Sequence, residues 1–82
     1  MAEHIARTEQ QLGAIIRRQR RSAGLSQSAL GELVHLRQAT ISRLEKGEPA
    51  IQLKTLMEIL AALQLELVVR PRSTSDQIIN LF

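Results

Sequence analysis

The sequence contains no cysteine, no tryptophan and no tyrosine, and Phe82 is its single aromatic residue. The lack of cysteine excludes a disulfide framework, a thiolate metal site and thiol redox chemistry. No apolar run approaches the roughly 20 residues that cross a bilayer, and the N-terminus has no signal-peptide core. We therefore expect a soluble, cytoplasmic protein that makes no contact with a membrane.

Groups that carry catalysis are equally scarce. His4 and His35 stand far apart in the sequence, Asp76 is the only aspartate, and no glycine-rich phosphate loop is present. These absences predict that the protein is not an enzyme and holds neither a metal nor a cofactor.

The 82 residues, of which 44% are hydrophobic, suffice for one small folded domain with a core of Leu, Ile, Val and Ala. The formal net charge is +3, and it is unevenly distributed. Residues 1–47 carry eight basic and four acidic side chains, whereas residues 48–82 carry three and four. The first half is thus where a polyanion would dock, although such a cluster is often only a solvated surface.

The spacing of apolar residues predicts four helices, at about 9–23, 27–34, 37–46 and 52–64. Thr8 and Gln11 form a capping-box pattern before the first helix, and Ser26 caps the second. Leu30, Leu33 and Val34 should point inward from the second helix. The fourth is apolar over a broad surface, which predicts burial against its own domain and against a second copy.

A short strand is expected at residues 65–70, where the chain becomes rich in β-branched residues before Pro71. A lone strand needs a partner, and the same strand of a second copy can supply it about a two-fold axis. Leu65, Leu67, Val68 and Val69 would then form the dimer contact. The alternative is that the fourth helix frays into an extended tail.

The predicted organisation is an N-terminal arm at 1–8, a helical domain at 9–64, the strand at 65–70 and a flexible tail at 71–82. The tail ends in an apolar group that has two interpretations, a segment that folds onto a partner protein or a frayed terminus. This group consists of Ile78, Ile79, Leu81 and Phe82.

Residues 27–46 have the pattern of two helices joined by a tight turn. Apolar residues can fill the angle between them at Leu30, Val34, Leu36, Ile41 and Leu44. Gly31 provides a small residue where the second helix crosses the first, at the cost of helix propensity. His35 stands at the turn, and histidine is among the residues enriched at positive φ.

This segment resembles the helix-turn-helix of the phage-repressor/Cro family, over about residues 12–64. Residues 24–27 (GLSQ) match the family's entry into its second helix, and 38–42 (QATIS) with 44–47 (LEKG) match its recognition helix and exit. Gly31 and His35 depart from the usual Ala and Gly. The resemblance implies an all-α repressor/Cro-type domain, of the five-helix type with about four main helices, extended here by the dimer strand.

Within that family, residues 38–42 and 65–67 are most similar to HipB-like antitoxins. This likeness implies a homodimeric, nucleoid-associated repressor that binds an inverted-repeat operator in double-stranded DNA, regulates its own operon and binds a HipA-like kinase toxin. The resemblance to the phage-repressor/Cro family also implies that Arg20 and Glu45 form a buried ion pair.

The docking mode of this family places the N-terminal part of the recognition helix in the major groove, with its outward side chains at base edges. The expected base contacts are Arg37, Gln38, Ala39, Ser42 and Arg43. Gln suits adenine, Arg suits guanine, and Ala suits the thymine methyl group. The expected phosphate contacts are Ser26, Gln27, Ser28, Thr40, Lys46, Arg17 and Arg18, of which the first three lie at a helix N-terminus.

Two other functions stay open on sequence grounds. One is a phage or plasmid repressor that has no toxin partner. The other is an interaction module that keeps the fold and does not read DNA, since a fold alone does not determine a function.

Overall fold

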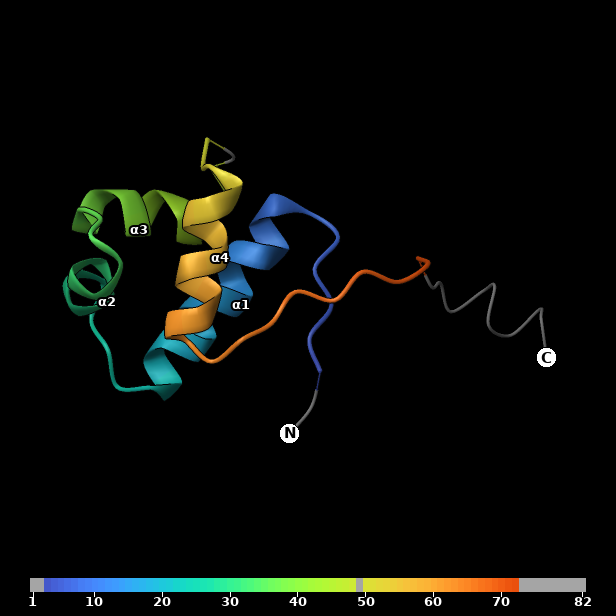
Figure 1. The fold of residues 1–82 in the computed structure, drawn as a ribbon, viewed down its shortest axis with the longest axis horizontal. Helices are drawn as coiled ribbons and strands as arrows, with labels where there is room; N and C mark the ends of the chain where they lie inside the picture. The colour runs from blue at the N-terminus through green and yellow to red at the C-terminus, as the bar shows by residue number, and fades with distance from the viewer. Residues whose placement is uncertain (1–2, 49, 73–82) are drawn as a thin grey trace.

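The computed structural model describes residues 3–48 and 50–72. Four helices account for all the regular structure in that part of the chain: α1 (Glu9–Ser22), α2 (Gln27–Val34), α3 (Gln38–Glu45) and α4 (Leu53–Ala62) (Figure 1). The predicted all-α class and the four helices are confirmed. Among the described residues, no helix is both long and apolar enough to cross a membrane.

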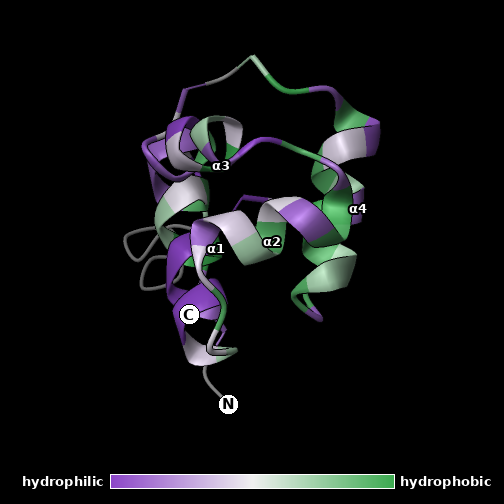
Figure 2. Cartoon of the chain, turned by 90° about the vertical axis from the view of Figure 1, so that its left-hand side faces the viewer, coloured by the Kyte–Doolittle hydropathy of each residue, from purple (hydrophilic) through white to green (hydrophobic). Residues whose placement is uncertain are grey.

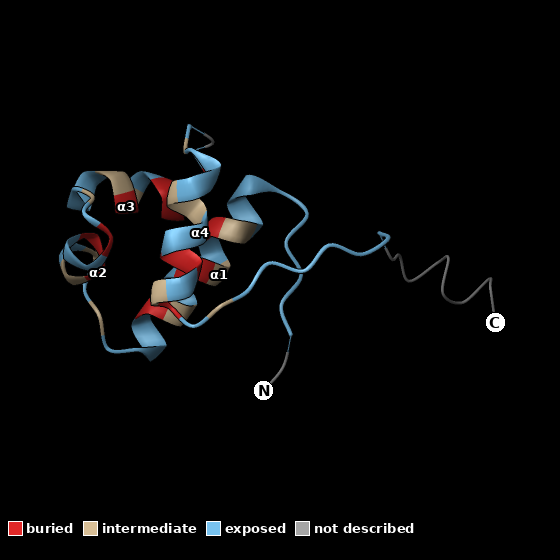
Figure 3. Ribbon diagram, in the orientation of Figure 1, coloured by how far each residue is buried: buried red, intermediate tan, exposed pale blue. Residues whose placement is uncertain are grey.

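The core lies where the four helices face one another (Figure 3). It is built from aliphatic side chains that are buried on every helix: Ile16, Leu30, Val34, Ile41, Leu44, Ile59, Leu60 and Leu63. Leu36 is half-buried and packs against this group. The prediction that Leu33 points inward is wrong, because 58% of it is exposed. The buried stripe of the short helix α2 is narrow and comprises Leu30, Gly31 and Val34.

The helix starts follow the predicted caps. Thr8 Oγ1 accepts from the Gln11 amide at 3.1 Å, and Ser26 Oγ accepts from the Ala29 amide at 3.0 Å. Gln11 reaches back to the Arg7 amide, which donates to its Oε1 at 2.6 Å. The amides of Gln11 and Ala29 belong to the first turns of their helices, where backbone donors have no partner within the helix, and the amide of Arg7 lies just before α1. Each of these donors is satisfied by one of the three bonds.

All four helices end in the same way, with a residue in the left-handed conformation followed by an amide that bonds five residues back. The left-handed residues are Gly24, His35, Gly47 and Gln64, with φ between 59° and 89°. The returning bonds run from Leu25 to Arg20, Leu36 to Gly31, Glu48 to Arg43 and Leu65 to Leu60. His35 thus takes the expected conformation. Gln64 follows the end of α4 at Ala62, a position with no stop signal in the sequence.

Gly13 and Gly31 each lie close to the backbone of another part of the chain. A Cβ atom on Gly31 would lie 2.4 Å from the carbonyl oxygen of Leu36. Leu36 belongs to the turn between α2 and α3 and not to α3 itself. An alanine at position 31 would clash with the turn. Gly31 therefore avoids a steric clash, whereas the sequence-based expectation considered only its cost in helix propensity. A Cβ atom on Gly13 would lie 2.5 Å from the carbonyl oxygen of Leu44, so α1 approaches the end of α3 closely.

Beyond α4, residues 65–72 are extended and form no strand in the single chain that the structure describes. Leu67, Val68 and Val69 are 51%, 66% and 90% exposed. The N-terminal arm crosses this segment (Figure 1), with Arg70 Nη1 3.8 Å from Glu3 Oε1. Pairing of the segment with a second copy stays a prediction, and the apolar group at 78–82 lies outside the described residues.

Candidate nucleic-acid interface

The N-terminal half of α3 presents the residues expected to meet bases. Arg37, Gln38, Ala39 and Arg43 are exposed, and Ser42 is half-buried. Ile41 and Leu44 are turned into the core on the opposite side of the helix. In Figure 2, purple prevails along α1 and green along α4, whereas both colours occur on α3. The polar side of α3 is therefore free of contacts with the core.

Arg20 and Glu45 form the ion pair that the resemblance implied. The guanidinium of Arg20 bonds the carboxylate twice, from Nε to Oε2 at 2.6 Å and from Nη2 to Oε1 at 3.1 Å. Its third nitrogen, Nη1, donates to the carbonyl oxygen of Leu25 at 2.8 Å. The two side chains are 8% and 3% exposed, so the pair joins α1 to α3 inside the protein.

The pKa of Glu45 reflects two opposing influences. Burial alone would raise it, but hydrogen bonds from Arg20 and Gln27, together with the positive charges of Arg20 and Arg17, hold the pKa below its ordinary value. The hydrogen bond to Glu45 raises the pKa of Arg20 despite its burial. Both groups are therefore charged at neutral pH.

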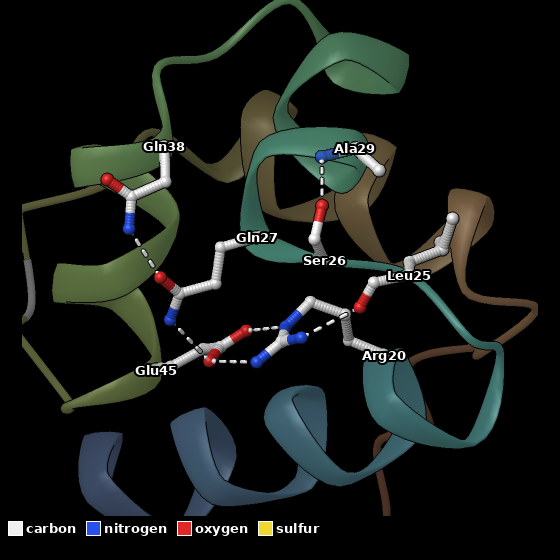
Figure 4. Close-up of polar contacts among 7 residues, drawn as sticks. All are labelled: Arg20, Leu25, Ser26, Gln27, Ala29, Gln38 and Glu45. Atoms are coloured by element: carbon white, nitrogen blue, oxygen red, sulfur yellow. Dashed lines mark hydrogen bonds and ion pairs between the residues drawn. The ribbon is translucent and has the colours of Figure 1, made fainter.

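A chain of hydrogen bonds connects this buried pair to the exposed face of α3 (Figure 4). Gln27 Nε2 donates to Glu45 Oε1 at 3.0 Å, and Gln38 Nε2 donates to Gln27 Oε1 at 2.5 Å. Gln27 is half-buried, and its side-chain amide uses both ends within the protein. A phosphate contact at the start of α2 stays a prediction, and from Gln27 it would come from the backbone. The sequence contains no signal for this connection, because it depends on how closely α2 and α3 start.

The charge on Glu45 fixes the direction of that chain. An ionised carboxylate only accepts hydrogen bonds, so Gln27 must turn its NH₂ group toward Glu45 and its oxygen toward Gln38. Gln38 must then turn its own NH₂ group toward Gln27, which leaves its carbonyl oxygen directed away, as Figure 4 shows. The exposed amide thus offers an acceptor and one remaining N–H, the pair of groups that adenine matches in the major groove.

The start of α2 lies beside the start of α3, because the Gln27–Gln38 bond joins the first residues of the two helices. Ser26 and Ser28 are exposed at this helix N-terminus. Ser26 Oγ accepts from a backbone amide, and its own hydroxyl hydrogen can still be donated. The geometry brings a place suited to phosphate next to the base-reading residues.

Arg17 and Arg18, both expected at phosphates, lie on different sides of α1. Arg17 stands one helical turn before Arg20, whose side chain reaches Glu45 of α3. Its positive charge also helps to hold the pKa of Glu45 below its ordinary value. Arg18 lines a shallow hollow with His4, Ile5 and Ile15, beside the N-terminal arm. Only Arg17 is placed with the other expected contacts.

The C-terminal part of α3 carries the remaining candidates. Lys46 is exposed, and Thr40 is half-buried in a hollow that Arg43 and Glu48 also line. Arg43 Nε lies 3.7 Å from Glu48 Oε2, and both side chains are more than half exposed. An exposed pair of this kind contributes little to stability, so Arg43 can leave Glu48 at small cost.

No group of three or more His, Cys, Asp or Glu in the described part of the chain could hold a metal ion. The residues above offer an exposed polar surface that carries hydrogen-bond donors and acceptors.

Comparison with known proteins places this geometry in context. The profile of the helix-turn-helix family matches residues 16–69. Among solved structures, a chain of the HipA–HipB–O2–O3 complex is similar at a TM-score of 0.76 and 27% identity, over 87% of this chain and 100% of that chain. A chain of the HipB–O4 20mer complex gives a TM-score of 0.77 and 27% identity over the same shares. A HipB variant in complex with an O2 20mer gives 0.78 and 25% identity, over 88% and 100%. Curated protein sequences gave no significant match.

Proposed function

The chain belongs to the helix-turn-helix family, and from this membership we propose that it is a sequence-reading regulator that binds duplex DNA and not an enzyme. The observation that carries the proposal is the exposed start of α3, where Gln38 is held by Gln27 with its acceptor directed outward. In the family's docking mode this end of the recognition helix enters the major groove.

Gln38, Arg37 and Arg43 would read bases, with Ala39 and Ser42 beside them. Ser26, Ser28, Thr40, Lys46 and Arg17 would contact phosphates. We give Gln27 a positioning role through Gln38, and leave Arg18 as a solvated charge on the side of α1 that borders the N-terminal arm.

The regulator would act as a homodimer at an inverted repeat. Support comes from the extended segment 65–70, where Leu67, Val68 and Val69 are exposed although the start of the segment is fixed to α4 by the Leu65–Leu60 hydrogen bond. Exposed apolar residues gathered on an extended segment are typical of a surface that another chain covers.

The partner protein would be a HipA-like kinase toxin, with this chain as the antitoxin. The support is the likeness to a chain of the HipA–HipB–O2–O3 complex along its full length. The test is whether a HipA-like kinase that is coexpressed with this chain copurifies with it. Retention by a Q38A/R43A double variant that has lost DNA binding would separate the two activities.

The first experiment is a titration of the protein against its own upstream DNA and a scrambled duplex, at low and moderate salt. Specific binding should be at least ~10³-fold tighter, and both affinities should fall steeply as salt rises. Q38A/R43A should abolish the difference between the duplexes. K54A, which removes a positive charge from exposed Lys54 on α4, is the control and should retain it. Equal and weak binding to both duplexes would favour an interaction module.

Arg17 and Arg18 provide a matched pair for the placement of the protein on DNA. R17A should reduce the slope of log affinity against log salt by about 1, the loss of one phosphate contact. R18A should leave the slope unchanged because Arg18 lies beside the N-terminal arm. The reverse result would mean that another side of α1 faces the duplex.

A further inference from the structure

Glu48 comes directly after the turn that ends α3, and its backbone is held in place. Its amide donates to the carbonyl oxygen of Arg43 at 3.1 Å, and Gly47 before it is left-handed with a φ of 89°. A Cβ atom on Gly47 would lie 2.7 Å from the Cα atom of Gln10, so the turn is packed against the start of α1. The Glu48 side chain therefore leaves from a set position, although 57% of it is exposed.

This side chain lies on the same surface as the outward residues of α3. Together with Thr40 and Arg43 it lines a hollow of about 120 Å³ beside the helix. Its Oε2 atom lies 3.7 Å from Nε of Arg43, close enough for an ion pair. An acidic side chain at this place repels phosphates, so it does not add to the general affinity for DNA.

The ion pair is made at one side of the Arg43 guanidinium. A guanidinium can present two pairs of parallel donors, Nε with Nη2 and Nη1 with Nη2. The carboxylate of Glu48 lies at the Nε side, and the pair formed by Nη1 and Nη2 stays open on a side chain that is 63% exposed. Two parallel donors are what the O6 and N7 acceptors of guanine require in the major groove.

We propose that Glu48 is a specificity-determining residue, which holds Arg43 at its Nε side so that Nη1 and Nη2 bond a guanine of the operator. Glu48 touches no base in this arrangement and acts as a positioning residue through Arg43. The inference rests on the DNA binding proposed above, and it names the base that Arg43 reads and the residue that directs Arg43 to it.

Charge explains why this pair favours a base over the DNA backbone. A free arginine gains most from phosphates, because each contact releases counterions from the duplex. Arg43 and Glu48 together carry no net charge, so this gain is largely cancelled. The two hydrogen bonds to guanine depend less on net charge, since O6 and N7 belong to a neutral base. Glu48 therefore lowers binding to DNA of any sequence more than binding to a site with the matching guanine.

The ion pair becomes stronger when DNA is bound. In the free protein both side chains are more than half exposed, and an ion pair in water contributes little. A duplex that lies on α3 would exclude water from the pair, and charges attract each other more strongly where the dielectric constant is lower. Arginine also loses rotational freedom when it is fixed at a base, and a partner that already restricts it lowers this cost.

The test begins with the guanine. Each G·C pair of the site that the protein binds in its own upstream DNA is replaced in turn by A·T, and the loss of affinity at every position is recorded as a base profile. A bidentate contact predicts one position in each half-site where the wild type loses about five- to 150-fold. R43A should lose its sensitivity at that position alone, which identifies the guanine that Arg43 reads.

E48Q then tests the charge, because glutamine keeps the size of the side chain. The loss at the Arg43 position should become smaller by at least about threefold. Affinity for a scrambled duplex should rise about twofold or more, since Arg43 can then pair with a phosphate. E58Q removes the same charge from exposed Glu58 on α4 and is the matched control, which should leave the base profile unchanged. In the R43A background, E48Q should alter no position of the profile.

Three results would overturn the inference: no G·C position depends on Arg43, E48Q retains the full loss at that position, or E48Q changes the base profile in the R43A background as well. The wild-type titration against its own and scrambled DNA is read independently of these variants. If the wild type prefers its own DNA while E48Q behaves like the wild type, the proposed function stands and this inference is wrong. If the wild type shows no preference, both are wrong.

Discussion

Replacement of Glu45 by Gln should strongly destabilise the protein. The amide keeps the shape of the side chain but removes its charge, and the guanidinium of Arg20, only 8% exposed, loses its counter-ion. Removal of one partner from a buried pair costs about 3–5 kcal/mol. This loss is a large fraction of the total stability of a small domain, which is about 5–15 kcal/mol. Because each kcal/mol lowers the Tm of a domain of this size by about 4 °C or more, we expect Tm to fall by at least ~12 °C.

A double variant, R20M/E45M, separates the buried charge from the contact itself. Replacement of both partners by apolar residues of similar volume is often neutral or stabilising, because no ion needs to be desolvated. Here the carbonyl oxygen of Leu25 and the amide of Gln27 also lose their partners, at about 1 kcal/mol each. We expect the double variant to lie within ~2 kcal/mol of the wild type and to be more stable than E45Q.

The assay is urea unfolding followed by far-UV circular dichroism, since the chain has neither tryptophan nor tyrosine for fluorescence. Two results would contradict this explanation: E45Q lowers the free energy of unfolding by less than ~1 kcal/mol, or the double variant is as unstable as E45Q. In either case, E45Q does not act by leaving a buried charge uncompensated.

Three further results are expected. The pKa of Glu45 is lowered in the folded state, so its ionisation stabilises the protein. This contribution is fully present above the ordinary glutamate pKa of about 4.3 and is lost as the pH falls through the lowered pKa. An acid titration of stability should show this drop in the wild type and not in E45Q. G13A should destabilise by about 1–3 kcal/mol although alanine favours helices, because its Cβ would lie 2.5 Å from the carbonyl oxygen of Leu44; a more stable variant in thermal unfolding would contradict the close contact. Q64G should stabilise by about 1 kcal/mol by relieving a left-handed non-glycine residue, and Q64V should do the opposite; no difference between them in urea would mean that φ at this position is not strained.

The helices were predictable because their signals are local. Apolar spacing and the caps Thr8 and Ser26 gave the starts, and Gly24 and Gly47 gave two of the ends. Gln64 escaped prediction because glutamine has no preference for positive φ. Contacts from distant parts of the chain surround this residue: Gln19 Nε2 of α1 donates to the Leu63 carbonyl oxygen at 3.1 Å, and Leu65 packs against the core.

The site was predictable only at the level of exposure. Helical periodicity is enough to place Gln38 and Arg43 outside and Ile41 inside. It does not reveal that Gln27 contacts Gln38, because the two residues come from separate helices and meet only through the turn at His35. The different surroundings of Arg17 and Arg18 likewise depend on the course of the N-terminal arm, which has no periodic pattern.

The hydrogen-bond chain from Glu45 to Gln38 bears on attempts to redirect the protein to new DNA sequences. In a library that randomises position 38 alone, every new side chain faces the carbonyl oxygen of Gln27, which Glu45 prevents from turning away. An acidic side chain at position 38 would be repelled by this oxygen even in the absence of DNA, so such variants would be depleted. Side chains that donate a hydrogen bond would be enriched. Altered specificity at this position therefore calls for positions 27 and 38 to be varied as a pair, with Glu45 retained.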